Sequence, residues 1–102
     1  MKIHNKLVRD KIPQIIEASN KIPISHILSD TEYITELERK LNEEVAEYQQ
    51  DKNLEEMADV LEVLYAICEA KGYTIEQLEE KRKEKADERG GFRDKIYLDY
   101  VE

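Results

Sequence analysis

Residues 43–59 read EEVAEYQQDKNLEEMAD, and this stretch decides how the rest of the chain is arranged. It holds two pairs of acidic residues at a spacing of three, Glu44 with Glu47 and Glu56 with Asp59. Residues three apart lie on the same side of an α-helix, so each pair presents two carboxylates side by side.

The connection between the two acidic segments is very short. Asp51-Lys52 separates a helix that ends near Gln50 from one that is capped by Asn53. So short a link predicts an antiparallel helical hairpin. We therefore expect all four acids to meet at the closed end of this hairpin.

Helical phase places several of these acids on apolar faces. With each residue turned by about 100°, Glu44 falls inside the apolar stripe of the first helix and Glu47 at its edge, whereas Glu43 points to solvent. The stripe consists of Tyr33, Ile34, Leu37, Leu41, Val45 and Tyr48.

The second helix has two apolar faces that lie nearly opposite each other. One face consists of Leu54, Met57, Ala58, Leu61, Leu64, Tyr65 and Cys68. The other consists of Val60, Val63, Ala66, Ile67 and Ala70, and Glu56 and Asp59 extend it towards the helix start. A single chain of 102 residues has few elements with which to cover both faces, which favours a homo-oligomer.

Acids at such positions need a partner, because an unpaired buried charge costs several kcal/mol or more. No Lys or Arg is expected beside them on these faces. Clustered carboxylates favour a hard cation, and the predicted ligands are Glu44, Glu47, Glu56 and Asp59. An ordinary interpretation stays open for single residues, since Glu56 is also placed to complete a capping box with Asn53.

Capping residues and glycines delimit the expected helices. These are a short helix over 14–17 after Pro13, one from Ser29 or Asp30 to about Gln50, one from Asn53 to Lys71 before Gly72, and one from Thr74, with Gln77, to Gly90-Gly91. Residues 96–101 are either a short strand or a docking arm. The predicted fold is all-α, with one domain over residues 1–102.

Composition narrows the class of partner. The formal net charge of −8 makes a nucleic-acid polymer an unfavourable partner. No apolar run reaches transmembrane length, so no membrane partner is expected, and the single Cys68 fits a reducing cytoplasm. Cys68 is predicted to be a core residue, and His4 and His26 are not predicted to be ligands.

The last long helix carries a basic line, Arg82, Lys85 and Arg89, which prolongs the apolar face that begins with Ile75 and Leu78. Its opposite side is acidic. A basic line of this kind suits an anionic ligand or the acids of a neighbouring chain, while solvated helix decoration is the ordinary alternative.

Together these residues resemble a known family. The acid pairs look like the signature of the all-α nucleoside triphosphate pyrophosphohydrolases, which include MazG-like proteins, dimeric dUTPases and phosphoribosyl-ATP pyrophosphohydrolase. The motifs over 6–13, KLVRDKIP, and 88–92, ERGGF, are similar to a short, single-domain MazG-like subgroup. The resemblance extends from about residue 6 to residue 93.

The resemblance implies a Mg²⁺-dependent enzyme, with Mn²⁺ as a substitute metal, that cleaves a nucleoside triphosphate between the α and β phosphates. Its products would be a nucleoside monophosphate and pyrophosphate, and removal of non-canonical nucleotides is a role that fits. A homodimer or homotetramer with a four-helix-bundle-like core is also implied. The acid pairs are closer together than in longer MazG proteins, so base specificity is not carried over.

By position, the resemblance makes Glu44, Glu47, Glu56 and Asp59 the metal ligands. We nominate Glu47 as the catalytic acid that orients the attacking water. The residues expected to bind the substrate phosphates are Lys6, Arg9, Arg82, Lys85 and Arg89. Two alternatives stay open: a phosphoribosyl-ATP pyrophosphohydrolase, and a non-catalytic helical interaction protein stabilised by metal.

Overall fold

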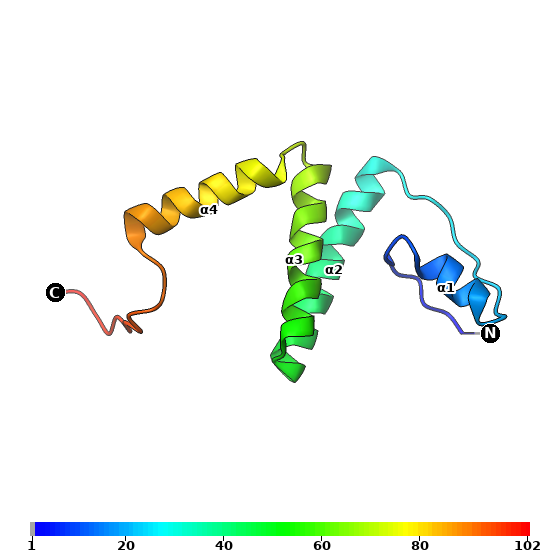
Figure 1. Cartoon of the computed structure of the whole chain (residues 1–102), viewed down its shortest axis with the longest axis horizontal. Helices are drawn as coiled ribbons and strands as arrows, with labels where there is room; N and C mark the ends of the chain where they lie inside the picture. The colour runs from blue at the N-terminus through cyan, green and yellow to red at the C-terminus, as the bar shows by residue number, and fades with distance from the viewer. Residues whose placement is uncertain (1) are drawn as a thin grey trace.

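The computed structural model describes residues 2–102 and contains four helices (Figure 1). They are α1 (Ile12–Ala18), α2 (Asp30–Asp51), α3 (Leu54–Ala70) and α4 (Ile75–Arg89). No strand occurs within residues 2–102, so the all-α prediction is confirmed. The short strand considered for residues 96–101 is wrong, since this segment is irregular and its apolar side chains are exposed.

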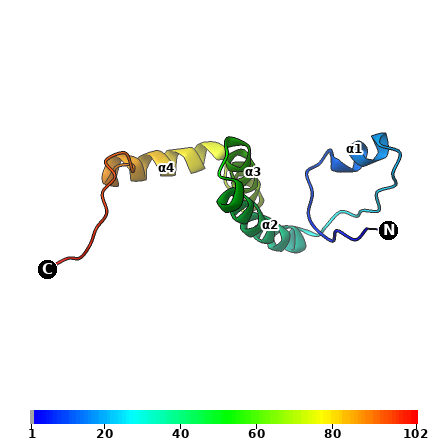
Figure 2. The same ribbon diagram turned by 90° about the horizontal axis from the view of Figure 1, so that it is seen from below.

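Helices α2 and α3 lie side by side as the predicted hairpin (Figures 1 and 2). Helix α2 runs one residue further than expected, so the connection consists of Lys52 and Asn53. Lys52 adopts a left-handed backbone with φ of 51°, and its N–H donates to the Tyr48 carbonyl at 2.7 Å. This residue lets the chain reverse within two positions.

The predicted caps are present. The Ser29 hydroxyl accepts from the Glu32 N–H, and the Ser29 N–H donates to the Glu32 carboxylate, which is a complete capping box. Thr74 and Gln77 form a second box at the start of α4. Gly72, with φ of 88°, follows α3, and the Tyr73 N–H bonds back to the Cys68 carbonyl. This is the Schellman arrangement that ends a helix at glycine.

The core of the chain is thin. The buried apolar residues are Leu37 on α2 and Val63 and Cys68 on α3. The Cys68 thiol also donates to the Thr74 carbonyl at 3.4 Å, which confirms it as a core residue. The α3 face around Val63 is thus covered, whereas much of the opposite face is open to solvent: Leu54, Met57, Leu61 and Leu64 are 78%, 47%, 46% and 40% exposed.

The chain is extended for its length. Its radius of gyration is 18.0 Å, whereas a compact chain of this size has about 13 Å. Helix α4 leaves the hairpin at the end of α3 opposite the Lys52-Asn53 connection, and the segment that holds α1 lies on the other side of the hairpin (Figures 1 and 2). Within residues 2–102, every helix is too short or too polar to cross a membrane.

Candidate metal centre

Five acidic residues gather at the closed end of the hairpin, and we call them the acid cluster: Glu43, Glu44, Glu47, Glu56 and Asp59. Glu44 from α2 and Glu56 and Asp59 from α3 each offer a carboxylate oxygen, and these three oxygens lie within 4.8 Å of one another. A second group of the same kind joins Glu44 to Glu43 and Glu47. Glu44 belongs to both groups and is therefore the centre of the cluster.

The spacing of these oxygens suits a small divalent cation. Oxygen ligands lie about 2.0–2.1 Å from Mg²⁺, so two ligands on opposite sides of the ion are separated by about 4.2 Å. The oxygens of Glu44, Glu56 and Asp59 lie within 4.8 Å of one another, which is close enough for one ion to be shared among them. Small side-chain rotations would bring the three carboxylates to coordination distance.

Two buried oxygen atoms of the cluster have no hydrogen-bond partner. They are Oε2 of Glu44, a residue that is 7% exposed, and Oε2 of Glu56. Buried polar atoms in folded proteins are almost always paired, so these two oxygens are the atoms of the cluster at which a ligand could be accommodated. The ligand that two carboxylate oxygens accept is a cation or a proton donor.

The capping interpretation of Glu56 accounts for only half of this residue. The Asn53 side chain accepts from the Glu56 N–H at 2.9 Å, as an N-cap should. In a complete capping box, the side chain of the third helical residue also accepts from the N–H of the capping residue. This second bond is present at the starts of α2 and α4, but the Glu56 carboxylate does not accept from the Asn53 N–H at the start of α3. The Glu56 carboxylate is therefore free to act as a ligand in the cluster.

The proton affinities of the cluster reflect its crowding. Burial raises the pKa of Glu44, and the negative charge of Glu47 raises it further, while Lys40 opposes both effects. Desolvation also raises the pKa of Glu56, followed by the charges of Asp59, Asp51 and Glu44. Burial and crowding thus disfavour the ionised form of both carboxylates, and a cation bound beside them would favour it.

The expectation that no Lys or Arg lies near the acids is wrong. Lys40, one helical turn before Glu44, is half-buried and lies 3.4 Å from Glu44 Oε1 and 3.5 Å from Glu43 Oε1. Its position four residues before Glu44 was a signal that sequence reasoning missed. Lys6 and Arg9, two predicted phosphate ligands, also reach the cluster, at Glu43 and Asp59 respectively.

These partners neutralise the cluster only in part. The five carboxylates in their ionised form face three cationic side chains, which leaves a formal charge of −2. Oε2 of Glu44 and Oε2 of Glu56 have no hydrogen-bond partner even though these three cations form four ion pairs with the cluster. One divalent cation would neutralise this remaining charge.

Glu43 and Glu47 are placed differently from the sequence-based expectation. Glu43 was expected to point to solvent, but it is half-buried and pairs with Lys40 and Lys6. Helical phase describes α2 alone, whereas Lys6 comes from the amino-terminal segment and reaches Glu43 from outside the helix. Glu47 is exposed and reaches Glu44 without joining the group of Glu44, Glu56 and Asp59.

The basic line of α4 is not brought to the acid cluster. Helix α4 starts at the far end of α3 and points away from the hairpin (Figure 1). Arg82 instead pairs with Glu79 on its own helix, and Lys85 and Arg89 are exposed. The structure thus joins Arg9 to the predicted metal ligand Asp59 and Lys6 to Glu43, the neighbour of Glu44. It does not bring Arg82, Lys85 or Arg89 to the acid cluster of the same chain.

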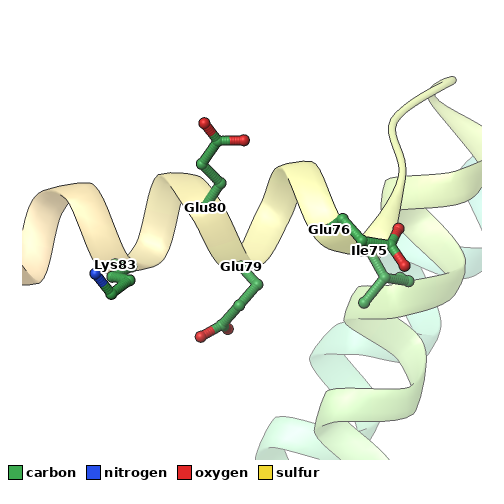
Figure 3. A pocket seen from close by; sticks show the side chains of 5 residues that line it. All are labelled: Ile75, Glu76, Glu79, Glu80 and Lys83. Carbon is green, nitrogen blue, oxygen red and sulfur yellow. The ribbon is translucent and has the colours of Figure 1, made fainter.

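A shallow pocket on α4 is a poor candidate for the same chemistry. It is lined by Ile75, Glu76, Glu79, Glu80 and Lys83 (Figure 3). Three carboxylates outnumber the single ammonium of Lys83, so the net charge of the pocket lining repels a polyphosphate. The Glu79 and Glu80 side chains also point to different sides of the helix, so they do not converge on one ligand (Figure 3). Within residues 2–102, the groups of acids that could hold a metal ion are those at the closed end of the hairpin.

Comparison with known proteins gives one relative. The chain is 55% identical over 42 residues to a protein of Mycolicibacterium smegmatis that is described as uncharacterized. The match covers 41% of this chain and 43% of that protein, so it spans less than half of either. No protein-family model matches the chain, and no significantly similar solved structure was found.

Proposed function

We propose that this chain is a Mg²⁺-dependent nucleoside triphosphate pyrophosphohydrolase of the MazG-like type. The observation that carries the proposal is the pair of buried, partnerless oxygens of Glu44 and Glu56 next to Asp59. A purely structural cluster would satisfy these atoms with its own cations, three of which are already close. Mn²⁺ is expected to replace Mg²⁺, because both favour carboxylate ligands.

The residues of the cluster would divide the work as follows. Glu44, Glu56 and Asp59 would hold the cation, whose chemistry would be to neutralise phosphate charge and to lower the pKa of a water molecule. Glu47 is exposed at the edge of the site. Its carboxylate would orient the water that attacks the α phosphorus and would accept the proton that this water loses. The bond from this phosphorus to the α–β bridging oxygen then breaks, and pyrophosphate leaves.

We further propose that the active form is a homodimer or homotetramer. Support comes from the open α3 face of Leu54, Met57, Leu61 and Leu64 and from the extended shape of the chain. Packing this face against a second hairpin would produce a four-helix core. Replacing Leu61 by Glu should then yield a smaller species in size-exclusion chromatography with light scattering, whereas an unchanged mass would exclude this face as the interface.

An oligomer would also give the basic line of α4 a place to act. Helix α4, which carries Arg82, Lys85 and Arg89, points away from the hairpin of its own chain (Figure 1). We therefore propose that these residues contact a polyphosphate that is bound at the acid cluster of a second copy. We expect the protein to work in the cytoplasm on free nucleotides, because its charge of −8 disfavours polymeric nucleic acid.

The experiment is a panel of nucleotides, including phosphoribosyl-ATP, incubated with the protein in Mg²⁺ or in EDTA. We expect Mg²⁺-dependent release of pyrophosphate rather than orthophosphate. Glu56→Gln should lower the rate at least about 100-fold, because a metal ligand is lost, while the matched Glu55→Gln, an exposed neighbour, should stay within about twofold of the wild type. No pyrophosphate release from any nucleotide, despite Mg²⁺ binding, would favour the non-catalytic interaction protein instead.

A further inference from the structure

The amino-terminal segment is tied to the acid cluster by its cations. Arg9 Nη2 donates to Asp59 Oδ1 at 2.6 Å, across 50 positions of sequence. Lys6 Nζ lies 3.8 Å from Glu43 Oε1. Most other ion pairs within residues 2–102 join residues three or four apart on one helix.

The backbone fixes where the Arg9 side chain starts. The Ile12 N–H donates to the Arg9 carbonyl at 3.0 Å, so Arg9 lies in a turn that leads into α1. Asn5 takes a left-handed conformation with φ of 45°, which Asn tolerates, and bends the chain just before Lys6. The guanidinium therefore reaches Asp59 from an anchored position, although 57% of its side chain remains exposed.

Arg9 and a metal ion need the same carboxylate. Asp59 is one of the three acids whose oxygens converge within 4.8 Å, and Arg9 occupies one of its oxygens. A divalent cation bound there would repel the guanidinium at short range and withdraw charge from the carboxylate that holds it. By contrast, Lys40 holds Glu44 through Oε1 and leaves Oε2 free.

We infer that Arg9 is the resident counter-ion of Asp59 in the metal-free protein and that a divalent cation displaces it, so that metal binding releases the guanidinium for phosphate. This inference rests on the proposed metal site and adds an order of events to it. The metal must bind before Arg9 can contact phosphate, and release of the Arg9 side chain from Asp59 accompanies metal binding. A freed guanidinium offers the planar fork of donors that phosphate oxygens accept.

The test measures Mg²⁺ binding to the nucleotide-free protein by isothermal titration calorimetry. Arg9→Gln should bind Mg²⁺ about two- to fivefold more tightly than the wild type, which is the range for a partly exposed ion pair. The matched control is Lys11→Gln, which removes the same charge two positions away from a side chain with no ion pair among the described residues. This control should change the affinity by less than about 1.5-fold, because its charge is exposed and screened.

A second measurement follows the guanidinium itself. Nitrogen-15 NMR of the arginine side chains, with the Arg9 signal assigned by its loss in Arg9→Gln, should show the wild-type signal moving to a solvent-exposed position as Mg²⁺ is added. An affinity for Mg²⁺ that is unchanged or weaker in Arg9→Gln, or an Arg9 signal that does not move, overturns the exchange while leaving the metal site intact. Absence of Mg²⁺ binding to the wild type overturns both the site and the exchange.

Discussion

Replacing Glu44 by Gln is expected to stabilise the metal-free protein. Glu44 is 7% exposed, and its Oε2 faces other carboxylates without a hydrogen-bond partner. An amide at this position keeps an acceptor for Lys40 and turns the orphan atom into a donor towards its acidic neighbours. The substitution therefore replaces a repulsive contact with a hydrogen bond.

The magnitude follows from two opposing effects. A hydrogen bond formed in place of an unsatisfied buried atom contributes about 1–1.5 kcal/mol. Loss of the charged pair with Lys40, at a spacing of four on one helix, costs about 0.3–0.5 kcal/mol. The net gain of about 0.5–1.2 kcal/mol corresponds to a rise in melting temperature of roughly 2–10 °C for a chain of this size.

The assay is thermal unfolding in EDTA and in Mg²⁺ at one fixed protein concentration, because an oligomer unfolds in a concentration-dependent way. Glu44→Gln should melt above the wild type in EDTA. With Mg²⁺ at ten times its dissociation constant, the wild type gains about 1.4 kcal/mol by mass action, so the order should reverse. The matched control Glu43→Gln loses contacts with Lys40 and Lys6 and should gain nothing in EDTA. A Glu44→Gln protein that melts below the wild type in EDTA would refute the reasoning.

Three further outcomes are expected. In EDTA, urea unfolding should show that Glu56→Gln is more stable than Asp59→Asn, because Asp59 pairs with Arg9 whereas no described cation pairs with Glu56. The reverse order would mean that pairing with a cation does not determine which acid destabilises the metal-free protein. The advantage of Glu44→Gln over the metal-free wild type should shrink as the pH falls towards 4.5, the ordinary pKa of Glu, because the raised pKa lets folded Glu44 take up its proton first; denaturation at pH 7.5 and 5 would reveal a constant difference if this is wrong. Ser29→Ala should cost about 1 kcal/mol through loss of the N-cap, measured by urea unfolding against an exposed loop serine, and no loss would show that the box at the start of α2 contributes nothing.

The helices were predictable because short-range capping interactions determine where they begin and end. Ser29, Asn53 and Thr74 cap helices, and Gly72 and Gly90 end them, through bonds to residues only a few positions away. The approach of Glu44 to Glu56 and Asp59 also followed, since a short connection leaves an antiparallel hairpin as the compact arrangement. Glu47 was expected in the same group and is not part of it. These features depend on spacing, which a sequence displays directly.

The partners of the acids were harder to predict because they come from distant segments. Arg9 and Asp59 are 50 positions apart, and no sequence pattern predicts a contact between them. The exposure of Glu43 was misjudged for the same reason. Helical phase describes the faces of one helix, and it cannot show that Lys6 from the amino-terminal segment pairs with Glu43. Lys40 is different, because its position relative to Glu44 was readable in the sequence.

The placement of α4 shows a second limit. The phase of its basic line was read from one helix, but its use depends on where α3 ends and in which direction the chain then leaves. Because α4 points away from the hairpin (Figure 1), Arg82 finds its partner in Glu79, three residues earlier. A pattern on one helix therefore predicts a face, not the site that this face serves.

The central claim is that a divalent cation binds between Glu44, Glu56 and Asp59. The most direct measurement is paramagnetic broadening of backbone amide NMR signals by substoichiometric Mn²⁺. We expect broadening centred on residues 44–59 and reversed by excess Mg²⁺, with the equally acidic surface of α4 around Glu79 and Glu80 unaffected. Broadening that is spread over all acidic surfaces, or strongest on α4, would contradict the claim.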